Sequence, residues 1–305
     1  MKLCQFYVPG KGKRVGVVDG DAVIDVTAPK NGAGSALELI TAAGTADRLE
    51  RQLRMLARRA RTRVAWRDLD RVPAARKSHL LAPVDPPEVW GAGITYMRSR
   101  EYYEAHQTEG TRSKGIYDYV YSAKRPELFF KATAARTAGP NAPVGIRGDS
   151  TLTAVEPELA VVIGKNGAIV GYTIGNDLSA WDIERENPLY LPQSKMFDGC
   201  FACGPVIVTA GELRDPHALE LSCRILRAGK LRWEGRTNTG TMKRRSAELV
   251  DWLGRGNTCS PPGTVLSTGT GILVPDEHAL EAGDVVEITL EGVGTLRNPV
   301  RRLPS

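Results

Sequence analysis

The stretch VEPELAVVIGKNGAIVGYTIGND, residues 155–177, consists of two apolar runs joined by the dipeptide Asn-Gly at positions 166 and 167. Between apolar runs this dipeptide typically forms the two central residues of a type I′ turn, the tight turn of a β-hairpin. Such a turn places Glu156 opposite Asp177. Glu158 is two residues further along and therefore on the same face, opposite Gly175, which has no side chain. The stretch thus predicts a hydrophobic hairpin with three carboxylates on one face.

The three acids of this hairpin admit two interpretations. Carboxylates so close together repel one another and raise each other's pKa, so the arrangement is unfavourable unless a cation neutralises it. Oxygen-only ligands suit hard divalent ions such as Mg²⁺, Mn²⁺ or Ca²⁺. The alternative is a strand that faces solvent, with its acids pointing into water. The pattern alone leaves both interpretations open.

The whole chain has the composition of a soluble globular protein, with 305 residues, 42% hydrophobic and 25% charged, which excludes disordered and fibrous classes. No apolar run approaches the ~20 residues of a membrane span, and the start, MKLCQFYVPGKGKRV, has no apolar core like that of a secretory signal. The five cysteines are an odd number, scattered over a long chain, which favours free thiols in a reducing compartment. We expect a cytoplasmic protein without membrane partners.

The chain is mildly basic, with a formal charge of +6 and a pI near 9.1, and its densest basic stretch is residues 51–71. The apolar residues of that stretch follow a partial helical spacing, and no aromatic residues are interleaved with the arginines as in a nucleic-acid platform. We therefore interpret it as the solvated face of a helix and expect no nucleic-acid partner. A mildly positive surface equally favours a small anionic substrate by electrostatic steering.

Composition divides the chain into two parts. Residues 1–80 hold short strand patterns followed by a helical pattern from Ala36 to Arg63, and they predict a small N-terminal α/β domain. Residues 80–93 carry three prolines and two glycines, which is typical of an extended connector. Residues 81–305 predict a β-rich domain of short strands, among them Gly271–Val274, and its clearest helix is Met242–Leu253.

Several strings of this second part recur in order in a known family. They resemble the fumarylacetoacetate hydrolase superfamily, and within it the branch of 2-keto-3-deoxy-D-arabinonate dehydratases, over about Gly91 to Val300; the strings are RPELFFKATAARTAGP, EPELAVVIG, GYTIGND and ENPLYLPQSKMFDGCFACGPVIV. The resemblance implies an α+β, mostly β fold, a mixed β-roll. It also implies a divalent site, for Mg²⁺ or Mn²⁺, at Glu156, Glu158 and Asp177. It thereby favours the metal interpretation of the hairpin acids.

The resemblance also implies a chemistry. Family substrates are 2-oxo acids that chelate the ion, which stabilises an enolate and acidifies C3. In the dehydratase branch a base removes a C3 proton and the 4-hydroxyl leaves, so a five-carbon 2-keto-3-deoxy sugar acid becomes a dioxo acid such as 2-oxoglutarate semialdehyde. Hydrolytic members carry a water-activating His-x-x-Glu pair, whose positions are here Ser99 and Tyr102. We therefore expect a Mg²⁺-dependent hydro-lyase acting in pentose catabolism.

Other functions remain open at this stage. One is a hydrolase or decarboxylase that acts on a 2-oxo or 2,4-dioxo acid with the same metal site. Another is a catalytically silent metal-binding or ligand-binding protein. The family frequently reads Ser-Ala-Arg-Asp after the metal aspartate, whereas this chain has Trp181 in place of the arginine, which replaces a charged fork by a large apolar ring. The family also implies a homo-oligomer, a dimer or tetramer.

The catalytic candidates are Lys195 and Glu127. Lys195, in LPQSK, matches a lysine beside the metal in the family and is expected to bind the oxoacid or shuttle a proton. Glu127 and Lys131, in RPELFFKA, share one face of a strand by their even spacing. We take Glu127 as the acid or base for dehydration and Lys131 as a substrate or ion-pair partner. A purely structural Glu–Lys pair is the alternative.

Five further residues are expected to bind the substrate through polar groups. Thr268, Gly269 and Thr270, in LSTGTGILVP, match a turn that offers amide and hydroxyl donors to a carboxylate in the family. Ser99 belongs to the dehydratase-like string SRE, and Arg100 next to it carries a guanidinium fork suited to anions.

Overall fold

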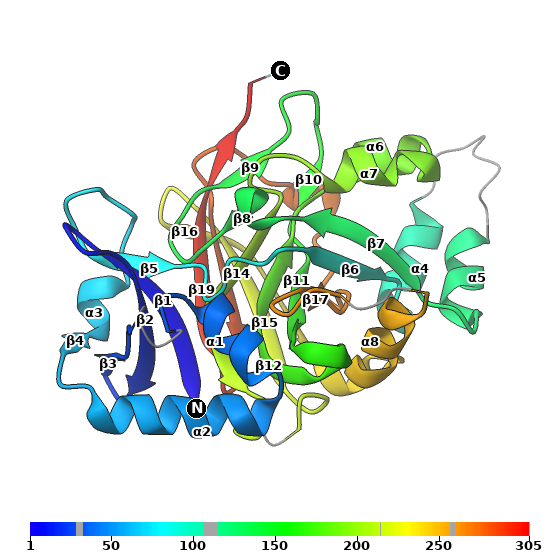
Figure 1. Cartoon of the computed structure of the whole chain (residues 1–305). Coiled ribbons are helices and arrows are strands. Elements are labelled where there is room, and N and C mark those ends of the chain that lie inside the picture. Colours follow the sequence, from blue (N-terminus) through cyan, green and yellow to red (C-terminus); the bar gives the residue numbers. More distant parts are fainter. Residues whose placement is uncertain (29–32, 107–114, 214, 257–259, 305) are drawn as a thin grey trace.

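The computed structural model of the chain describes residues 1–28, 33–106, 115–213, 215–256 and 260–304 (Figure 1). Over these residues the largest element is a sheet of twelve strands. The strands are β1 (Lys2–Val8), β2 (Gly12–Asp19), β3 (Ala22–Asp25), β4 (Arg63–Ala65), β5 (His79–Leu81), β6 (Val89–Gly93), β7 (Glu127–Ala132), β8 (Thr137–Ala138), β11 (Pro157–Ile163), β12 (Ile169–Asp177), β14 (Phe201–Thr209) and β17 (Val265–Ser267). Their order is β4-β3-β2-β1-β14-β12-β11-β17-β6-β7, with β5 paired to β1 and β8 to β14.

The remaining strands of the described residues form two smaller sheets. The five-stranded sheet contains, in spatial order, β16 (Lys230–Asn238), β15 (Glu220–Arg227), β18 (Val285–Leu290), β19 (Gly294–Arg302) and β9 (Val144–Ile146). The two-stranded sheet pairs β10 (Thr153–Ala154) with β13 (Ser179–Ala180). Strands thus dominate the fold, and the prediction of a mostly β, α+β architecture is confirmed.

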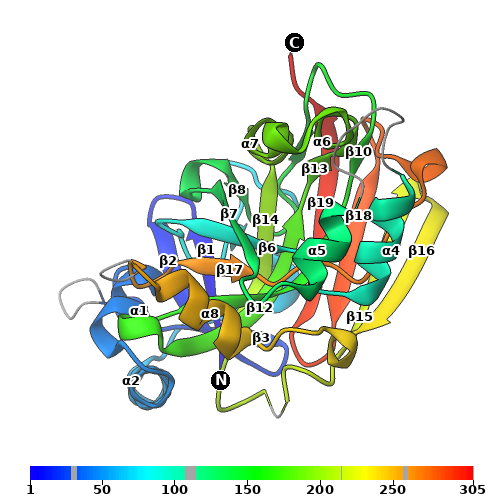
Figure 2. The ribbon, with the colours of Figure 1, turned by 90° about the vertical axis from the view of Figure 1, so that its right-hand side faces the viewer.

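The helices gather in two groups. They are α1 (Ala36–Ala43), α2 (Ala46–Arg59), α3 (Trp66–Leu69), α4 (Met97–Ala105), α5 (Ile116–Ser122), α6 (Trp181–Glu186), α7 (Leu191–Lys195) and α8 (Ser246–Gly254), with 3₁₀ turns η2 (Ala134–Arg136), η3 (Lys165–Gly167), η4 (Pro188–Tyr190), η5 (Thr239–Thr241) and η6 (Asp276–His278). The first three accompany the N-terminal strands, and α4 to α7 lie on the opposite side of the molecule (Figures 1 and 2). Among the described residues, no helix combines the length and apolar character that crossing a bilayer requires.

The N-terminal strands are continuous with the rest of the large sheet. β1 pairs antiparallel with β14, with Lys2 opposite Val208. The predicted domain boundary at residue 80 falls inside β5. The division into residues 1–80 and 81–305 stays a prediction. The helical pattern expected from Ala36 to Arg63 is two helices, because Gly44, at φ 71°, ends α1 in the left-handed conformation.

The central hairpin, β11 and β12, has the predicted turn. Asn166 and Gly167 have φ values of 55° and 74°, and the Ala168 amide donates to the Lys165 carbonyl at 3.0 Å, as in a type I′ turn. The pairing is irregular between Val162 and Ile163, close to the turn. From Val162 to the open end of the hairpin, the two strands pair in the predicted register.

At the open end of this hairpin the three acids lie where the turn predicts them. Glu158 pairs with Gly175, and the Asp177 amide donates to the Glu156 carbonyl at 3.0 Å. All residues of β11 are buried, and so are Glu156 and Asp177. A strand that exposes its acids to solvent is therefore the wrong interpretation.

Two element predictions are corrected. Gly271–Val274 does not form a strand, because its backbone bonds to side chains instead of to a neighbouring strand: the Thr270 hydroxyl accepts from the Ile272 amide at 3.1 Å. The helix expected from Met242 begins at Ser246, because Met242 forms a bridge with Tyr96. The strand in this region is β17, directly before the turn at Thr268.

Candidate active site with a carboxylate triad

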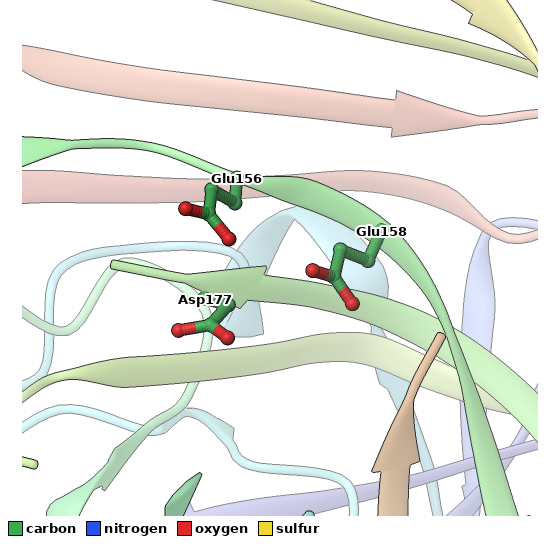
Figure 3. A group of neighbouring side chains, drawn as sticks. All are labelled: Glu156, Glu158 and Asp177. Atoms are coloured by element: carbon green, nitrogen blue, oxygen red, sulfur yellow. The ribbon is translucent and has the colours of Figure 1, made fainter. Parts of the chain in front are cut away.

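Glu156, Glu158 and Asp177, the carboxylate triad, point toward one another at the open end of the hairpin (Figure 3). One carboxylate oxygen from each lies within 4.8 Å of those from the other two. Their exposed fractions are 5%, 2% and 1%. The triad is thus a compact set of oxygen ligands with almost no bulk water around it.

Each carboxylate of the triad is held by contacts with the protein. Glu156 Oε1 accepts from the Trp181 indole at 2.7 Å and from the Tyr103 hydroxyl at 2.8 Å. Because both donors are neutral and buried, they orient the carboxylate without cancelling its charge. The second oxygen, Oε2, accepts from Lys195 at 2.9 Å.

The other two acids are held in the same way. Glu158 Oε2 accepts from the Gly269 amide at 2.7 Å. Asp177 Oδ1 lies 2.6 Å from the ammonium of Lys131. Asp177 Oδ2 is buried and receives no hydrogen bond from the described residues, although Lys195 lies 3.6 Å away. These contacts orient all three acids and leave Asp177 Oδ2 free for a shared ligand.

Burial and neighbouring charges shift the pKa values of Glu158 and Glu156 in opposite directions. Burial, with the charges of Asp177 and Glu156, raises the pKa of Glu158 well above its usual range. Burial also opposes ionisation of Glu156, but the charge of Lys195 and the hydrogen bonds from Trp181 and Tyr103 outweigh it and lower the pKa of Glu156. Glu158 is therefore the triad member whose ionisation most needs an additional cation.

The triad fits an oxygen-preferring divalent ion. Its donors are all carboxylate oxygens, which hard cations such as Mg²⁺ favour over zinc. Two lysines, 131 and 195, stand against the three acids, and the buried Asp177 oxygen has no donor among the described residues. The set of side chains and its charge thus match a divalent cation.

Lys195 connects the triad to a further acid. Its ammonium donates to Glu156 at 2.9 Å and to the Ser179 hydroxyl at 2.6 Å, and it lies 3.9 Å from Glu184. Burial opposes its charge, but Asp177, Glu156 and Glu184 outweigh this and raise the pKa of Lys195 well above its usual range. The lysine is thus a buried cation at the edge of the triad.

A small cavity opens beside the triad. Its lining is part apolar and part polar and comprises Ala92, Gly93, Ile94, Ser99, Tyr103, Glu127, Phe129, Glu156, Glu184, Leu191, Lys195, Gly269 and Thr270. It therefore brings Lys195 and Glu127, the predicted catalytic residues, together with Ser99, Gly269 and Thr270. The Ser99 hydroxyl donates to the Thr270 carbonyl, and the Thr270 hydroxyl donates to the Pro157 carbonyl at 2.9 Å.

The remaining predicted substrate ligands lie outside this lining. Lys131 is fully buried and, besides Asp177, its ammonium contacts the Leu178 carbonyl at 2.7 Å and that of Lys195 at 2.5 Å. Arg100 forms an ion pair with Asp118 at 3.1 Å. The Thr268 hydroxyl donates to the Leu159 carbonyl at 2.8 Å. Substrate contacts of these three residues stay predictions.

Two residues of the site, Tyr103 and Glu184, were not anticipated from the sequence. Tyr103 comes from α4 and Glu184 from α6, and both reach the cavity from elements distant from the hairpin. Burial raises the pKa of Glu184 to about 7, with Glu156 and Glu127 adding to the rise and Lys195 opposing it. The only sequence signal for Glu184 is its place between Trp181 and the family string that begins at Glu186.

The structure also accounts for Trp181. The ring is fully buried in a small apolar cluster with Ile94, Tyr103 and Leu273, and its indole reaches Glu156. A guanidinium is still present nearby, because Arg185, four residues later on α6, lies over the Trp181 ring at 5.4 Å. The site has therefore repacked around a neutral donor.

Comparisons with known proteins agree with this geometry. Residues 103–301 match the family model described as fumarylacetoacetate (FAA) hydrolase, C-terminal. The chain is 49% identical over 220 residues to 2-dehydro-3-deoxy-D-arabinonate dehydratase of Saccharolobus solfataricus, which covers 72% of this chain and 74% of the relative. It is 46% identical over 222 residues to a probable 2-keto-3-deoxyxylonate dehydratase of Haloferax volcanii, covering 73% and 75% of the two chains.

A solved structure resembles the whole chain. It is that of 2-keto-3-deoxy-D-arabinonate dehydratase in complex with magnesium and 2,5-dioxopentanoate. It aligns over all of both chains with a TM-score of 0.81 and 36% sequence identity.

Proposed function

This chain belongs to the fumarylacetoacetate hydrolase family, and on that premise we propose that it is a Mg²⁺-dependent dehydratase of a 2-keto-3-deoxy sugar acid. The substrate is a five-carbon acid like 2-keto-3-deoxy-D-arabinonate, and the product is 2,5-dioxopentanoate, also called 2-oxoglutarate semialdehyde. The two relatives are a dehydratase and a probable dehydratase of such acids, and the magnesium complex contains this product. The reaction belongs to the breakdown of pentose-derived acids.

The carboxylate triad would hold the metal ion, with Lys131 positioning Asp177 and the Gly269 amide positioning Glu158. Mg²⁺ at this place supplies Lewis-acid polarisation of a 2-oxo group, which acidifies the adjacent C3. The burial of the triad strengthens every electrostatic interaction made there.

The cavity residues perform the proton transfers and the binding. The Glu127 carboxyl takes the C3 proton, and no described residue donates a hydrogen bond to it, so its lone pairs are free for this task. Burial raises the pKa of Glu127, which makes it a stronger base than a solvated glutamate. The Lys195 ammonium neutralises negative charge that develops on the substrate. The Ser99 and Thr270 hydroxyls donate to carbonyls of the chain, so it is their oxygens that accept hydrogen bonds from substrate hydroxyls.

The observation that carries the proposal is the cavity, which is lined by Lys195, Glu127 and one acid of the buried triad, Glu156. At the two positions where hydrolytic members have their water-activating pair, the side chains are otherwise engaged. The Ser99 hydroxyl donates to Thr270, and the Tyr102 hydroxyl donates to Asp276 at 2.8 Å. This supports dehydration over hydrolysis.

Carbon NMR tests the proposal directly. Purified protein with Mg²⁺ is incubated with ¹³C-labelled 2-keto-3-deoxy-D-arabinonate and, separately, with a labelled 2,4-dioxo acid. We expect an intact five-carbon dioxo acid from the first substrate and no reaction of the second. Cleavage of the 2,4-dioxo acid into two fragments, with no change in the sugar acid, would show a hydrolase instead.

A further inference from the structure

Glu184 is a buried acid of the cavity to which the proposed function gives no role. It lies on α6, is 7% exposed and lines the cavity together with Glu127 and Lys195. Its Oε2 accepts a long hydrogen bond, 3.4 Å, from the Ser194 hydroxyl and lies 3.9 Å from the Lys195 ammonium. A carboxyl group so enclosed, without a close ion pair, is costly to keep unless it has a function.

Dehydration needs two proton transfers at neighbouring carbons. A base must take the C3 proton, and an acid must give a proton to the 4-hydroxyl, because hydroxide is a poor leaving group. Besides Glu156 of the triad, the described lining of the cavity contains two carboxyl groups, Glu127 and Glu184. Their number matches the two tasks.

The position of this pair indicates which end of the substrate it meets. A second hollow is lined by Ile116, Tyr117, Val120 and Pro188, and it shares Glu127, Glu184 and Leu191 with the cavity. None of the triad lines this second hollow. The two glutamates therefore stand where the cavity continues away from the triad, on the side left for the hydroxyl-bearing end of a substrate whose oxoacid end is at the triad.

We propose that Glu184 is the acid that protonates the departing 4-hydroxyl, while Glu127 takes the C3 proton; this inference rests on the proposed function. The C3–H bond breaks and its proton goes to the Glu127 carboxylate. The C4–O bond breaks as the oxygen takes the Glu184 proton and leaves as water, and the electron pair from C3 forms the C3–C4 double bond. Transfer of a C5 proton to C3 then moves the double bond to C4–C5, and the resulting 5-enol becomes the 5-aldehyde when its hydroxyl proton passes to C4, with no change in composition.

The surroundings of Glu184 suit this task. Burial and the charges of Glu156 and Glu127 raise the pKa of Glu184 to about 7, so it holds a proton near neutral pH and can release it. Its separation of 3.9 Å from Lys195 is longer than that of Glu156, which accepts from the same ammonium at 2.9 Å. The ammonium therefore stabilises the carboxylate of Glu156 more strongly than that of Glu184.

The test uses a leaving group that needs no proton. Fluoride departs unprotonated, so an analogue with fluorine in place of the 4-hydroxyl still requires the base but not the acid. Elimination from the natural substrate and from this analogue is measured with Mg²⁺ for wild type and for Glu184→Gln and Glu127→Gln. The matched control is Glu186→Gln, the same change at an exposed position of α6.

For Glu184→Gln we expect water elimination to fall at least about a hundredfold while fluoride elimination stays within about threefold of wild type. Glu127→Gln should lose both reactions, and Glu186→Gln neither. Retained fluoride elimination also shows that the variant is folded with its site intact.

Three results would overturn the inference. If Glu184→Gln lowers both eliminations equally, the residue has a structural or binding role. If it lowers neither, one other group does both transfers. If the wild type eliminates fluoride but never water, the proposed function fails and the role of Glu184 fails with it, whereas the first two results leave the dehydratase function standing.

Discussion

Trp181 is the residue at which this site departs most from its family pattern. Its indole holds Glu156 Oε1 at 2.7 Å, a place where a guanidinium would bring a full positive charge. A neutral donor orients the carboxylate and leaves its charge available to a cation. Trp181 in place of the family arginine is therefore compatible with metal binding.

Trp181→Phe keeps an aromatic ring at this buried position and removes the N–H donor to Glu156 together with part of the indole volume. We expect Mg²⁺ to bind about tenfold more weakly, since partners that orient metal ligands typically contribute 10- to 100-fold in affinity. Calorimetric titration with Mg²⁺, or Mn²⁺ binding followed by electron paramagnetic resonance, measures this. Trp90→Phe is the matched control, because it removes an indole donor to Glu88, at 2.9 Å, away from the triad. Equal affinity in both variants and wild type would contradict the role of Trp181.

Gly93 explains how Glu127 fits into the cavity. A Cβ at this position would lie 2.0 Å from Glu127 Oε2, so Gly93→Ala must displace the carboxyl group. We expect the rate of dehydration to fall about a hundredfold, because a misplacement of about 1 Å has an effect of that order. Steady-state kinetics measure the loss. Gly254→Ala, at a position with no atom within 4 Å of the added Cβ, should retain wild-type rates.

Helix α8 begins at a contact that requires a neutral imidazole on His217. No side chain of its N-cap residue, Arg245, caps the helix, and the Ser246 amide donates instead to His217 Nε2 at 3.2 Å. Burial lowers the pKa of His217, and the charge of Arg245 lowers it further while Asp215 opposes this. Only the neutral imidazole can accept the bond.

This contact predicts an acid-sensitive contribution to stability. Because the folded-state pKa is lowered, the contribution is fully present above the unfolded pKa of about 6.5 and is lost as pH falls through the folded value. His217→Gln retains an acceptor that does not titrate. When the pH is lowered from about 7.5 to about 5, the melting temperature should therefore fall further for wild type than for the variant. An identical fall in both would show that His217 does not supply this pH dependence.

Elements also mark the limit of what the sequence predicts. The turn at Asn166 and the register of the hairpin follow from local rules, so the meeting of Glu156, Glu158 and Asp177 was foreseeable. Lys195 was found by resemblance to a family string.

Tyr103 and Glu184 escaped prediction because contacts between α4, α6 and the hairpin depend on tertiary packing that no local pattern encodes. The apolar run Gly271–Val274 looked like a strand because periodicity reports burial, not the partner of the backbone.

For the molecule as a whole, the carboxylate triad makes stability depend on divalent cations. Three buried acids repel in the absence of a cation, as the raised pKa of Glu158 indicates, and a cation bound only by the folded chain stabilises it. That stabilisation amounts to about 2.7 kcal/mol at a Mg²⁺ concentration a hundred times Kd.

The effect of Glu158→Gln on the melting temperature should therefore change sign between EDTA and excess Mg²⁺. In EDTA its melting temperature should equal or exceed that of wild type, because one of the repelling charges is gone. With Mg²⁺ in excess the wild type should melt higher. Glu234→Gln, on the exposed edge strand β16, should follow wild type in both conditions. A Glu158→Gln protein that melts lower than wild type in EDTA would contradict this account of the triad.

The central claim is that the Mg²⁺ ion held by Glu156, Glu158 and Asp177 is the one on which dehydration depends. The most direct test measures Mg²⁺ occupancy by calorimetry and the rate of 2,5-dioxopentanoate formation by carbon NMR over one Mg²⁺ titration, for wild type and Glu158→Gln. The account predicts one ion per chain, a rate proportional to occupancy, and the loss of both in the variant. Full dehydration after chelation of the metal, or in a variant that no longer binds Mg²⁺, would contradict it.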